Sequence, residues 1–293
     1  MWIRPIAIAS AVVIGACAVL TASTPASAPT LAGAGREPLR FGPTWLPGGL
    51  TELSREYGAP VRQWALAPDN FSGNWQLLDL RPAFNCPNYR DPVDIDGRPG
   101  WFREGRHVLY LRGVCWQFDR HTHLELNTTL RTLTRDDLIR IARSVRPAAG
   151  TTSFPISVPS DAPRPFGLGA DPGWRRITGR SPTDWTATVS WSPGSRYRGQ
   201  RLEITAGPTT KAPDGGQLKT VRGRPARYLL DNDSPAGSSA YLVVDLGTHR
   251  YLTIQVDTYP PSEVAFFTLA MIAEETAVNL SRQPWIGARN LAR

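Results

Sequence analysis

Short motifs occur twice along this 293-residue chain, in the same order and at a nearly constant separation. Four pairs of segments match: residues 73–82 with 199–208, 95–99 with 221–225, 121–127 with 249–255, and 141–142 with 272–273. Such a repeat constrains the architecture strongly, because each copy must fold into the same kind of unit. We therefore predict a tandem duplication, with repeat module 1 at residues 40–147 and repeat module 2 at residues 152–280.

Both predicted modules contain alternating apolar and polar residues, which is the pattern of strands with one buried face. Residues 202–206 (Leu-Glu-Ile-Thr-Ala) alternate strictly in this way. Two hairpins are predicted, the first from residues 108–118 and 123–129, the second from residues 241–246 and 251–258. Gly97 and Gly223, each followed by Arg-Pro, predict a turn or a bulge.

Each predicted module ends in a helix. Residues 134–137 (Thr-Arg-Asp-Asp) have the spacing of a capping box, and an apolar stripe follows from Leu138 to Val145. Residues 264–279 predict a longer helix that is apolar around more of its circumference and is therefore more deeply buried. The predicted fold class is α+β, with two tandem copies of an antiparallel β-sheet module, each closed by a C-terminal helix.

The N-terminal residues 1–28 predict a signal peptide or a membrane anchor. Arg4 precedes an uncharged apolar run at residues 6–20. This pattern is typical of a signal peptide, and the run is short for a transmembrane helix. Residues 29–39 predict a flexible linker, and residues 281–293 form a tail that the sequence does not assign.

The fate of this N-terminal segment stays open between three alternatives. Ala26 and Ala28 offer a cleavage site, but Pro29 would directly follow the cut, which signal peptidases tolerate poorly. Cleavage and retention as an anchor are therefore both possible outcomes. Lipidation is the third alternative, because Cys17 ends the sequence Ile-Gly-Ala-Cys, which is similar to a lipoprotein box.

The two cysteines outside the N-terminal segment are Cys86 and Cys115. In an exported chain such a pair predicts a disulfide, which closes a loop of about 30 residues and stabilises the fold by roughly 3–4 kcal/mol. No Cys-x-x-Cys motif supports a redox or metal pair instead. We therefore predict that the body of the protein is extracytoplasmic, either membrane-anchored or secreted.

The formal net charge of +8 suggests an anionic partner, but the distribution of the charges argues against nucleic acid. Only Lys211 and Lys219 are lysines, and the arginines are scattered among acidic residues without a basic run longer than two. A nucleic-acid-binding face concentrates its basic residues. We predict no nucleic-acid partner, whereas weak attraction to anionic lipid or cell-wall polymer stays open.

The candidate metal ligands are His121, His123 and Glu125, which alternate on one predicted strand and so share a face. The competing interpretation is a solvent-facing strand surface, because Leu124 and Leu126 take the core face. The second module has His249, Tyr251 and Thr253 in these places, which cannot chelate a metal. We therefore predict no metal, no cofactor and, in the absence of a hydrolase motif, no enzyme.

Several short features resemble extracytoplasmic domains of bacterial, actinobacterial-type membrane proteins. Residues 44–50 (Thr-Trp-Leu-Pro-Gly-Gly-Leu) open the first module, Gly-Arg-Pro precedes a hairpin, and the closing helix has an Ile-Ala core. These features are similar to the sheet-plus-helix domains of anti-sigma and sporulation-associated proteins, broadly to RseB-type sigma regulators and lipoprotein carriers. The resemblance implies a sensing or binding role at the cell envelope and no catalytic residues.

The leading functional prediction is thus a non-catalytic, membrane-associated binding or sensing module with an envelope protein as its partner. The first alternative is a lipid- or lipoprotein-carrier with an apolar cavity. The second alternative is a hydrolase of unknown type. A cavity between sheet and helix would favour carriage, whereas a filled core would favour protein binding.

Overall fold

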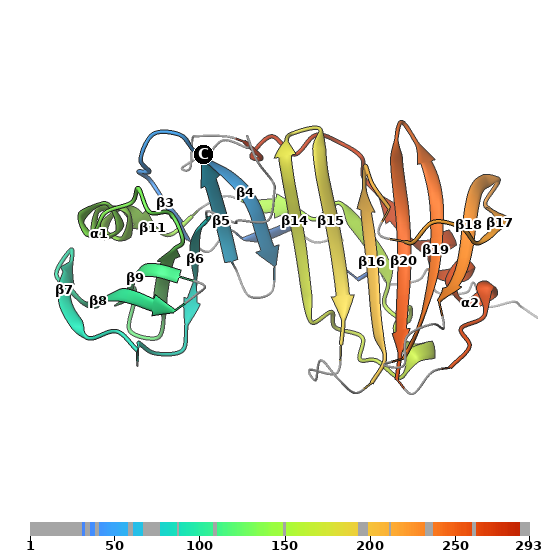
Figure 1. Ribbon diagram of the computed structural model, residues 1–293, viewed down its shortest axis with the longest axis horizontal. Coiled ribbons are helices and arrows are strands. Elements are labelled where there is room, and N and C mark those ends of the chain that lie inside the picture. Colours follow the sequence, from blue (N-terminus) through green and yellow to red (C-terminus); the bar gives the residue numbers. More distant parts are fainter. Residues whose placement is uncertain are drawn as a thin grey trace, which may run out of the picture.

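One antiparallel sheet of fourteen strands forms most of the protein (Figure 1). The computed structural model describes residues 31–32, 36–38, 41–57, 61–66, 77–86, 88–107, 110–148, 151–192, 199–210, 212–231, 237–259 and 262–287. In spatial order the strands are β17 (Gln217–Val221), β18 (Arg224–Asp231), β19 (Ser238–Gly247), β20 (Arg250–Thr258), β16 (Arg201–Gly207), β15 (Asp184–Trp191), β14 (Trp174–Ser181), β4 (Leu50–Tyr57), β5 (Val61–Leu66), β6 (Leu77–Ala83), β10 (His123–Thr128), β9 (Tyr110–Gln117), β8 (Arg98–His107) and β7 (Asp91–Ile95).

The smaller elements lie around this sheet. The helices are α1 (Arg135–Ser144), α2 (Phe266–Glu275) and the short 3₁₀ helix η1 (Arg164–Phe166). A three-stranded sheet contains β1 (Leu31–Ala32), β13 (Ile156–Pro159) and β21 (Ala277–Val278). Two strand pairs complete the fold, β2 (Arg36–Pro38) with β12 (Thr151–Ser153), and β3 (Gly42–Pro43) with β11 (Val145–Arg146).

The predicted fold class is wrong. Strands make up 53% of the structure and helices only 11%, so the protein is mostly β and not α+β. The two predicted modules are also not separate tandem units, because β4 pairs with β14 and joins all fourteen strands into one sheet. Figure 1 shows β4 in blue directly beside β14 in yellow. This pair, which we call the seam, satisfies backbone groups that two separate sheets would leave exposed at their edges.

The order of the strands is the same on both sides of the seam. Going outward, the first side runs β4, β5, β6, β10, β9, β8, β7, and the second runs β14, β15, β16, β20, β19, β18, β17. The matched motifs 95–99 and 221–225 begin at the ends of β7 and β17, and 141–142 and 272–273 lie in α1 and α2. The repeated motifs therefore mark equivalent positions in the two halves of one continuous sheet.

Both helices cover the same face of the sheet, which we call the covered face. A single row of paired residues runs along it from Leu126 through Arg62, Arg55 and Ile177 to Leu252. At one end α1 inserts its apolar stripe into a cluster that contains Trp64, Trp116, Leu124 and Leu126. At the other end α2 packs into a second cluster, formed with β15, β16, β19 and β20. Because both helices share a packed cluster with the strands, the side chains fill these interfaces.

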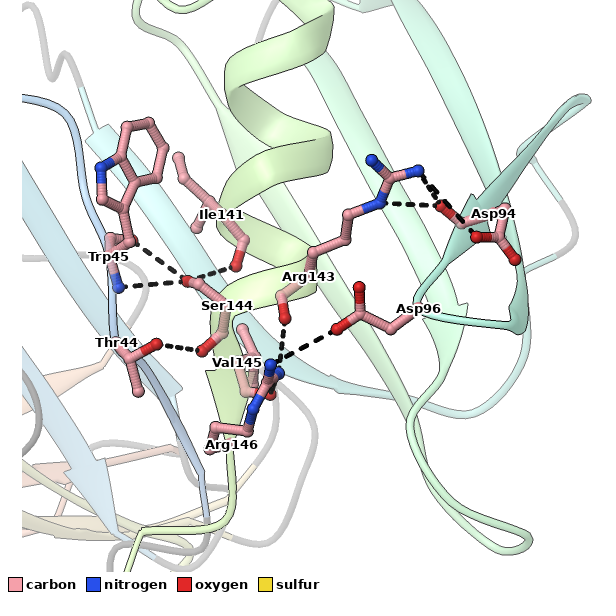
Figure 2. A network of polar contacts seen from close by, with 9 residues as sticks. All are labelled: Thr44, Trp45, Asp94, Asp96, Ile141, Arg143, Ser144, Val145 and Arg146. Atoms are coloured by element: carbon pink, nitrogen blue, oxygen red, sulfur yellow. Dashed lines mark hydrogen bonds and ion pairs between the residues drawn. The ribbon is translucent and has the colours of Figure 1, made fainter.

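Polar contacts fix the C-terminal end of α1 (Figure 2). Thr44 Oγ1 donates to the carbonyl of Ser144 at 2.9 Å, and the backbone N–H of Trp45 donates to Ser144 Oγ at 3.2 Å. Arg146 Nη1 lies 2.5 Å from the carbonyl oxygen of Arg143. The last carbonyls of a helix have no partner within it, so these contacts act as a C-terminal cap.

The local predictions have mixed outcomes. The pairs β9–β10 and β19–β20 confirm the two predicted hairpins, and Thr134 with Asp137 forms the predicted capping box of α1. The second helix is shorter than predicted, because residues 277–278 pair with β13 instead. Its predicted deeper burial is also wrong at Phe267 and Met271, which are exposed.

Within the described ranges, no helix has the length and apolar character needed to cross a membrane. Residues 1–28, including the segment 6–20 and Cys17, lie outside the described residues.

Candidate functional site

The face of the sheet opposite the helices, which we call the open face, has a polar row that crosses the seam. Thr178, Ser54, Gln63, Asp79 and Asn127 are successive cross-strand partners from β14 to β10. Alternate residues of a strand point to opposite faces, so these five side chains share one face. Ser54, Asp79 and Asn127 of this row are buried, so the row itself is not accessible to a partner.

A disulfide fastens the segment after β6 to this open face. Cys86 bonds to Cys115, and their Cα atoms lie 5.7 Å apart, as predicted from the sequence. Cys115 is buried on β9, directly opposite Glu125 on β10. The backbone N–H of Tyr89 donates to the carbonyl of Cys86 at 3.2 Å, which turns the chain back. The bond therefore positions Tyr89 near Glu125.

Five side chains form the cluster at this point, and we call it the Tyr89 cluster: Arg81, Tyr89, Arg103, Glu125 and Asn127. The Tyr89 hydroxyl lies 2.6 Å from Glu125 Oε1 and 2.8 Å from Asn127 Oδ1. Arg103 Nη2 donates to Asn127 Oδ1 at 3.1 Å, and its guanidinium lies 4.5 Å from the centre of the Tyr89 ring. Arg81 Nε donates to Glu125 Oε2 at 3.3 Å. Every member thus contacts at least one other.

The surroundings keep Glu125 ionised and Tyr89 neutral. Burial raises the pKa of the Glu125 carboxyl, but the hydrogen bond from Tyr89 and the charge of Arg81 outweigh it, so the pKa lies below the ordinary value. Burial and the hydrogen bond to Glu125 raise the pKa of the Tyr89 phenol. A carboxylate with a lowered pKa is a poor proton donor, and a phenol with a raised pKa is a poor nucleophile at neutral pH. The cluster is therefore suited to recognition rather than to proton transfer.

One side chain close in sequence to the cluster is very exposed. Phe84 follows β6 in the segment that the disulfide holds, and 97% of its surface is accessible to solvent. Arg81, three residues before it, is also partly exposed at the rim of the cluster. Aromatic and arginine side chains are the residue types that most often dominate protein interfaces. Phe84 and Arg81 are therefore the accessible side chains of this stretch of the chain.

A second polar cluster lies beneath the seam on the covered face. The Glu52 carboxylate, 3% exposed, accepts two hydrogen bonds from Arg55 at 2.7 and 2.8 Å, and two from Arg62 at 2.8 Å. Burial raises the pKa of Glu52, but the two guanidinium groups outweigh it and lower the pKa. The guanidinium carbon of Arg55 lies over the ring of Trp285 from the C-terminal segment, 4.1 Å from the ring centre. Gly287 donates its N–H to the Glu52 carbonyl at 2.9 Å.

This buried cluster is structural. A carboxylate held by two bidentate guanidinium groups has its hydrogen-bonding capacity filled, and the residues around it are buried. The register between β4 and β5 shifts at Glu52 and Ser54, which is where the cluster lies. The cluster therefore joins the seam, the strand irregularity and the C-terminal segment 283–287 into one packed unit.

The candidate metal ligands from the sequence are not brought together in this form. His121 is exposed in the turn after β9, where the Asp119 carboxylate accepts from its backbone N–H at 2.8 Å. His123 is half-buried at the start of β10, opposite Gln117. Glu125 has both oxygens in contact with Tyr89 and Arg81. Across the described part of the chain, no group of three or more His, Cys, Asp or Glu residues is arranged to hold a metal ion.

Sequence reasoning missed most of the two clusters. Tyr89 had one usable signal, its position three residues after a cysteine whose partner faces Glu125. Asn127 lies two residues after Glu125 and so shares its face. Nothing in the sequence singles out Arg55 or Arg62 among the 33 basic residues.

Comparison with known proteins returns no match, either among protein-family models, among curated proteins or among solved structures.

Proposed function

We propose that this chain is a non-catalytic, extracytoplasmic binding protein of the cell envelope, which meets a protein partner at the exposed side chain of Phe84. The observation that carries the proposal is Phe84, an almost fully exposed aromatic residue on a segment that a disulfide holds beside the Tyr89 cluster. A segment tied down by a disulfide loses less conformational entropy on binding than a free one, so an exposed aromatic side chain on it is a favourable anchor.

The disulfide supports an extracytoplasmic location, because disulfides persist in oxidising compartments and are rare in the cytosol. The apolar N-terminal run 6–20 would supply export or attachment to the membrane. The proposal therefore combines the predicted extracytoplasmic location with the position of the candidate site.

Packing on the covered face weighs against lipid carriage. The inward side chains Leu138 and Ile141 of α1 are fully buried in one cluster with Trp64 and Trp116. On α2, Leu269 is fully buried against the second half of the sheet. A lipid carrier needs apolar space at such a place, and large side chains occupy it here.

Site-specific photo-crosslinking in cells tests the proposal. A photoreactive phenylalanine analogue replaces Phe84 in the full exported chain, and a matched control carries it at exposed Glu275 of α2. We expect a discrete protein adduct from position 84 that position 275 does not give, and a weaker adduct when Arg81→Ser is added.

Two results would contradict the proposal. Adducts that contain only lipid or glycan would exclude a protein partner at Phe84. Equal capture from positions 84 and 275 would show that the contact is not specific to the Tyr89 cluster.

A further inference from the structure

The seam joins two halves whose apolar cores are separate. On the covered face, Leu80 of β6 belongs to the cluster that contains the buried residues of α1, and Ile177 of β14 belongs to the cluster that contains those of α2. Between them, in the same row of paired residues, lie the guanidinium side chains of Arg62 and Arg55. Apolar contacts therefore do not run continuously from one half to the other along this row.

Backbone pairing across the seam is also short. β4 and β14 share four residue pairs, which end at Ser54 and Thr178. Both strands are irregular just past this point. β4 shifts its register with β5 between Glu52 and Ser54, and β14 shifts its register with β15 between Gly179 and Ser181. The pairing of the two halves therefore stops where both strands lose their regular register.

The C-terminal segment lies at this point and bonds to both halves. Gly287 donates its backbone N–H to the carbonyl of Glu52 on β4 at 2.9 Å. Gln283 donates its backbone N–H to the carbonyl of Pro182, in the turn between β14 and β15, at 2.8 Å. Residues 283–287, which we call the clasp, thus connect the two sides of the seam.

Two side chains anchor the clasp, one on each half. Ile286 is 1% exposed and belongs to the apolar cluster of the second half. A Cβ atom at Gly179 would lie 2.8 Å from Ile286 Cδ1, so the glycine on β14 leaves the space that the isoleucine occupies. The neighbouring residue, Trp285, has the Arg55 guanidinium of β4 over its ring. Adjacent residues of the clasp therefore contact opposite halves.

We infer that the seam is a hinge and that the clasp holds it in one orientation. With the clasp bound, its hydrogen bonds and its two anchors keep β4 and β14 together where their own pairing stops. When the clasp is released, the four residue pairs of the seam are the connection that remains within the sheet. The halves then change their angle about the seam while each core stays packed.

Release of the clasp breaks no strand pairing. Among the described residues, the last strand is β21, which ends at Val278, before the clasp begins. The hinge sets the orientation of the first half, which carries Phe84, against the second half. It does not depend on the partner proposed for Phe84, so either proposal can fail alone.

Native-state hydrogen exchange of the full chain tests the inference. Trp285→Ala combined with Ile286→Asp removes both anchors, and Leu280→Asp is the matched control, because Leu280 is exposed in the same C-terminal segment. We expect amide exchange in β4 and β14 to rise at least about tenfold in the double variant, since losing buried contacts favours local opening. Exchange in the hairpins β9–β10 and β19–β20 should stay unchanged.

Distance measurements test the hinge itself. Spin labels at the exposed residues Asp136 on α1 and Glu275 on α2 report the separation between the two ends of the molecule. The distribution of distances should broaden in the double variant and stay narrow in Leu280→Asp. Trp285→Ala alone keeps Ile286 in place and should give an intermediate width.

Two results would overturn the inference. An equal rise of exchange in the seam and in both hairpins would show that the clasp belongs to one cooperative core and does not control a hinge. Seam exchange and a distance distribution that both stay as in the wild type would show that the seam keeps its geometry without the clasp.

Discussion

Gly113 on β9 lies directly against Asn127 on β10, so that a Cβ atom at position 113 would be 2.3 Å from Asn127 Oδ1. The same Cβ would lie 2.9 Å from the Tyr89 hydroxyl and 3.1 Å from the backbone carbonyl of Leu126. The Tyr89 cluster therefore occupies the space that any other residue at position 113 would need.

Gly113→Ala should consequently destabilise the protein by about 1–3 kcal/mol, the usual range for overpacking a filled site. Urea unfolding measures the change. Gly48→Ala is the control, because a Cβ at Gly48 meets nothing within 4 Å and should shift the free energy of unfolding by less than about 0.5 kcal/mol. Equal stability of the two variants would contradict the close packing of the cluster.

Removing the disulfide should loosen the site as well as the fold. Cys86→Ser combined with Cys115→Ser opens a loop with a sequence separation of 29, which should cost about 2–5 kcal/mol. Thermal unfolding with and without reductant measures this. The reductant should lower the midpoint of the wild type and leave the variant unaffected, and a wild type indifferent to reductant would contradict the prediction.

Breaking the buried Glu52 cluster should be costly, whereas replacing it as a whole should not. Glu52→Gln leaves Arg55 and Arg62 as buried, uncompensated cations, and we expect a loss of about 3–5 kcal/mol. The triple variant Glu52→Leu, Arg55→Met, Arg62→Met should recover most of that loss, because apolar side chains of similar volume need no partner. If the triple variant were less stable than Glu52→Gln, the cluster would contribute more to stability than the compensation of its own charges.

The stability provided by Glu125 should depend on pH. Its pKa in the folded state is lowered, so the carboxylate stabilises the fold fully above its ordinary pKa of about 4.3, and this contribution is lost as the pH falls through the folded value. At pH 7, Glu125→Gln should cost about 1.5–3 kcal/mol through its charged hydrogen bonds. The difference in free energy of unfolding between the wild type and the variant should therefore disappear at acidic pH.

Glu104→Gln serves as the control for that experiment. Glu104 pairs with Arg112 at 2.9 Å but is largely exposed, so its loss should change the stability by no more than about 1 kcal/mol. A Glu125→Gln gap that stays constant down to strongly acidic pH would contradict an ionised, hydrogen-bonded carboxylate.

Local features of the fold could be predicted from the sequence, but the sheet as a whole could not. Alternation identified the hairpins, and Thr134 with Asp137 identified the start of α1, because these signals lie within a few residues of each other. The seam depends on which strand edges meet, and its contact between Glu56 and Arg176 spans 120 residues. The alternation of residues within a strand does not indicate which other strand pairs with it. The sequence therefore predicts two modules, although the strands form one sheet.

The candidate site shows the same limit. The cysteine pair is predictable because its residue type carries known chemistry, whereas the sequence indicates Glu125 only as a discounted metal ligand. Arg62 went unnoticed because it shares a face with Trp64, and a charged residue in an alternating pattern normally marks the solvent side. Its burial becomes intelligible only once Glu52 and Arg55 are placed beside it by the neighbouring strand.

The seam also affects how the chain must be made. β4 is synthesised more than a hundred residues before β14, so the growing polypeptide carries an unsatisfied strand edge until its second half emerges. Contacts of such high sequence separation form late and slowly. The interval before β14 arrives is therefore the period in which a nascent chain of this kind most needs a chaperone, and a chain truncated before residue 174 would retain that exposed edge permanently.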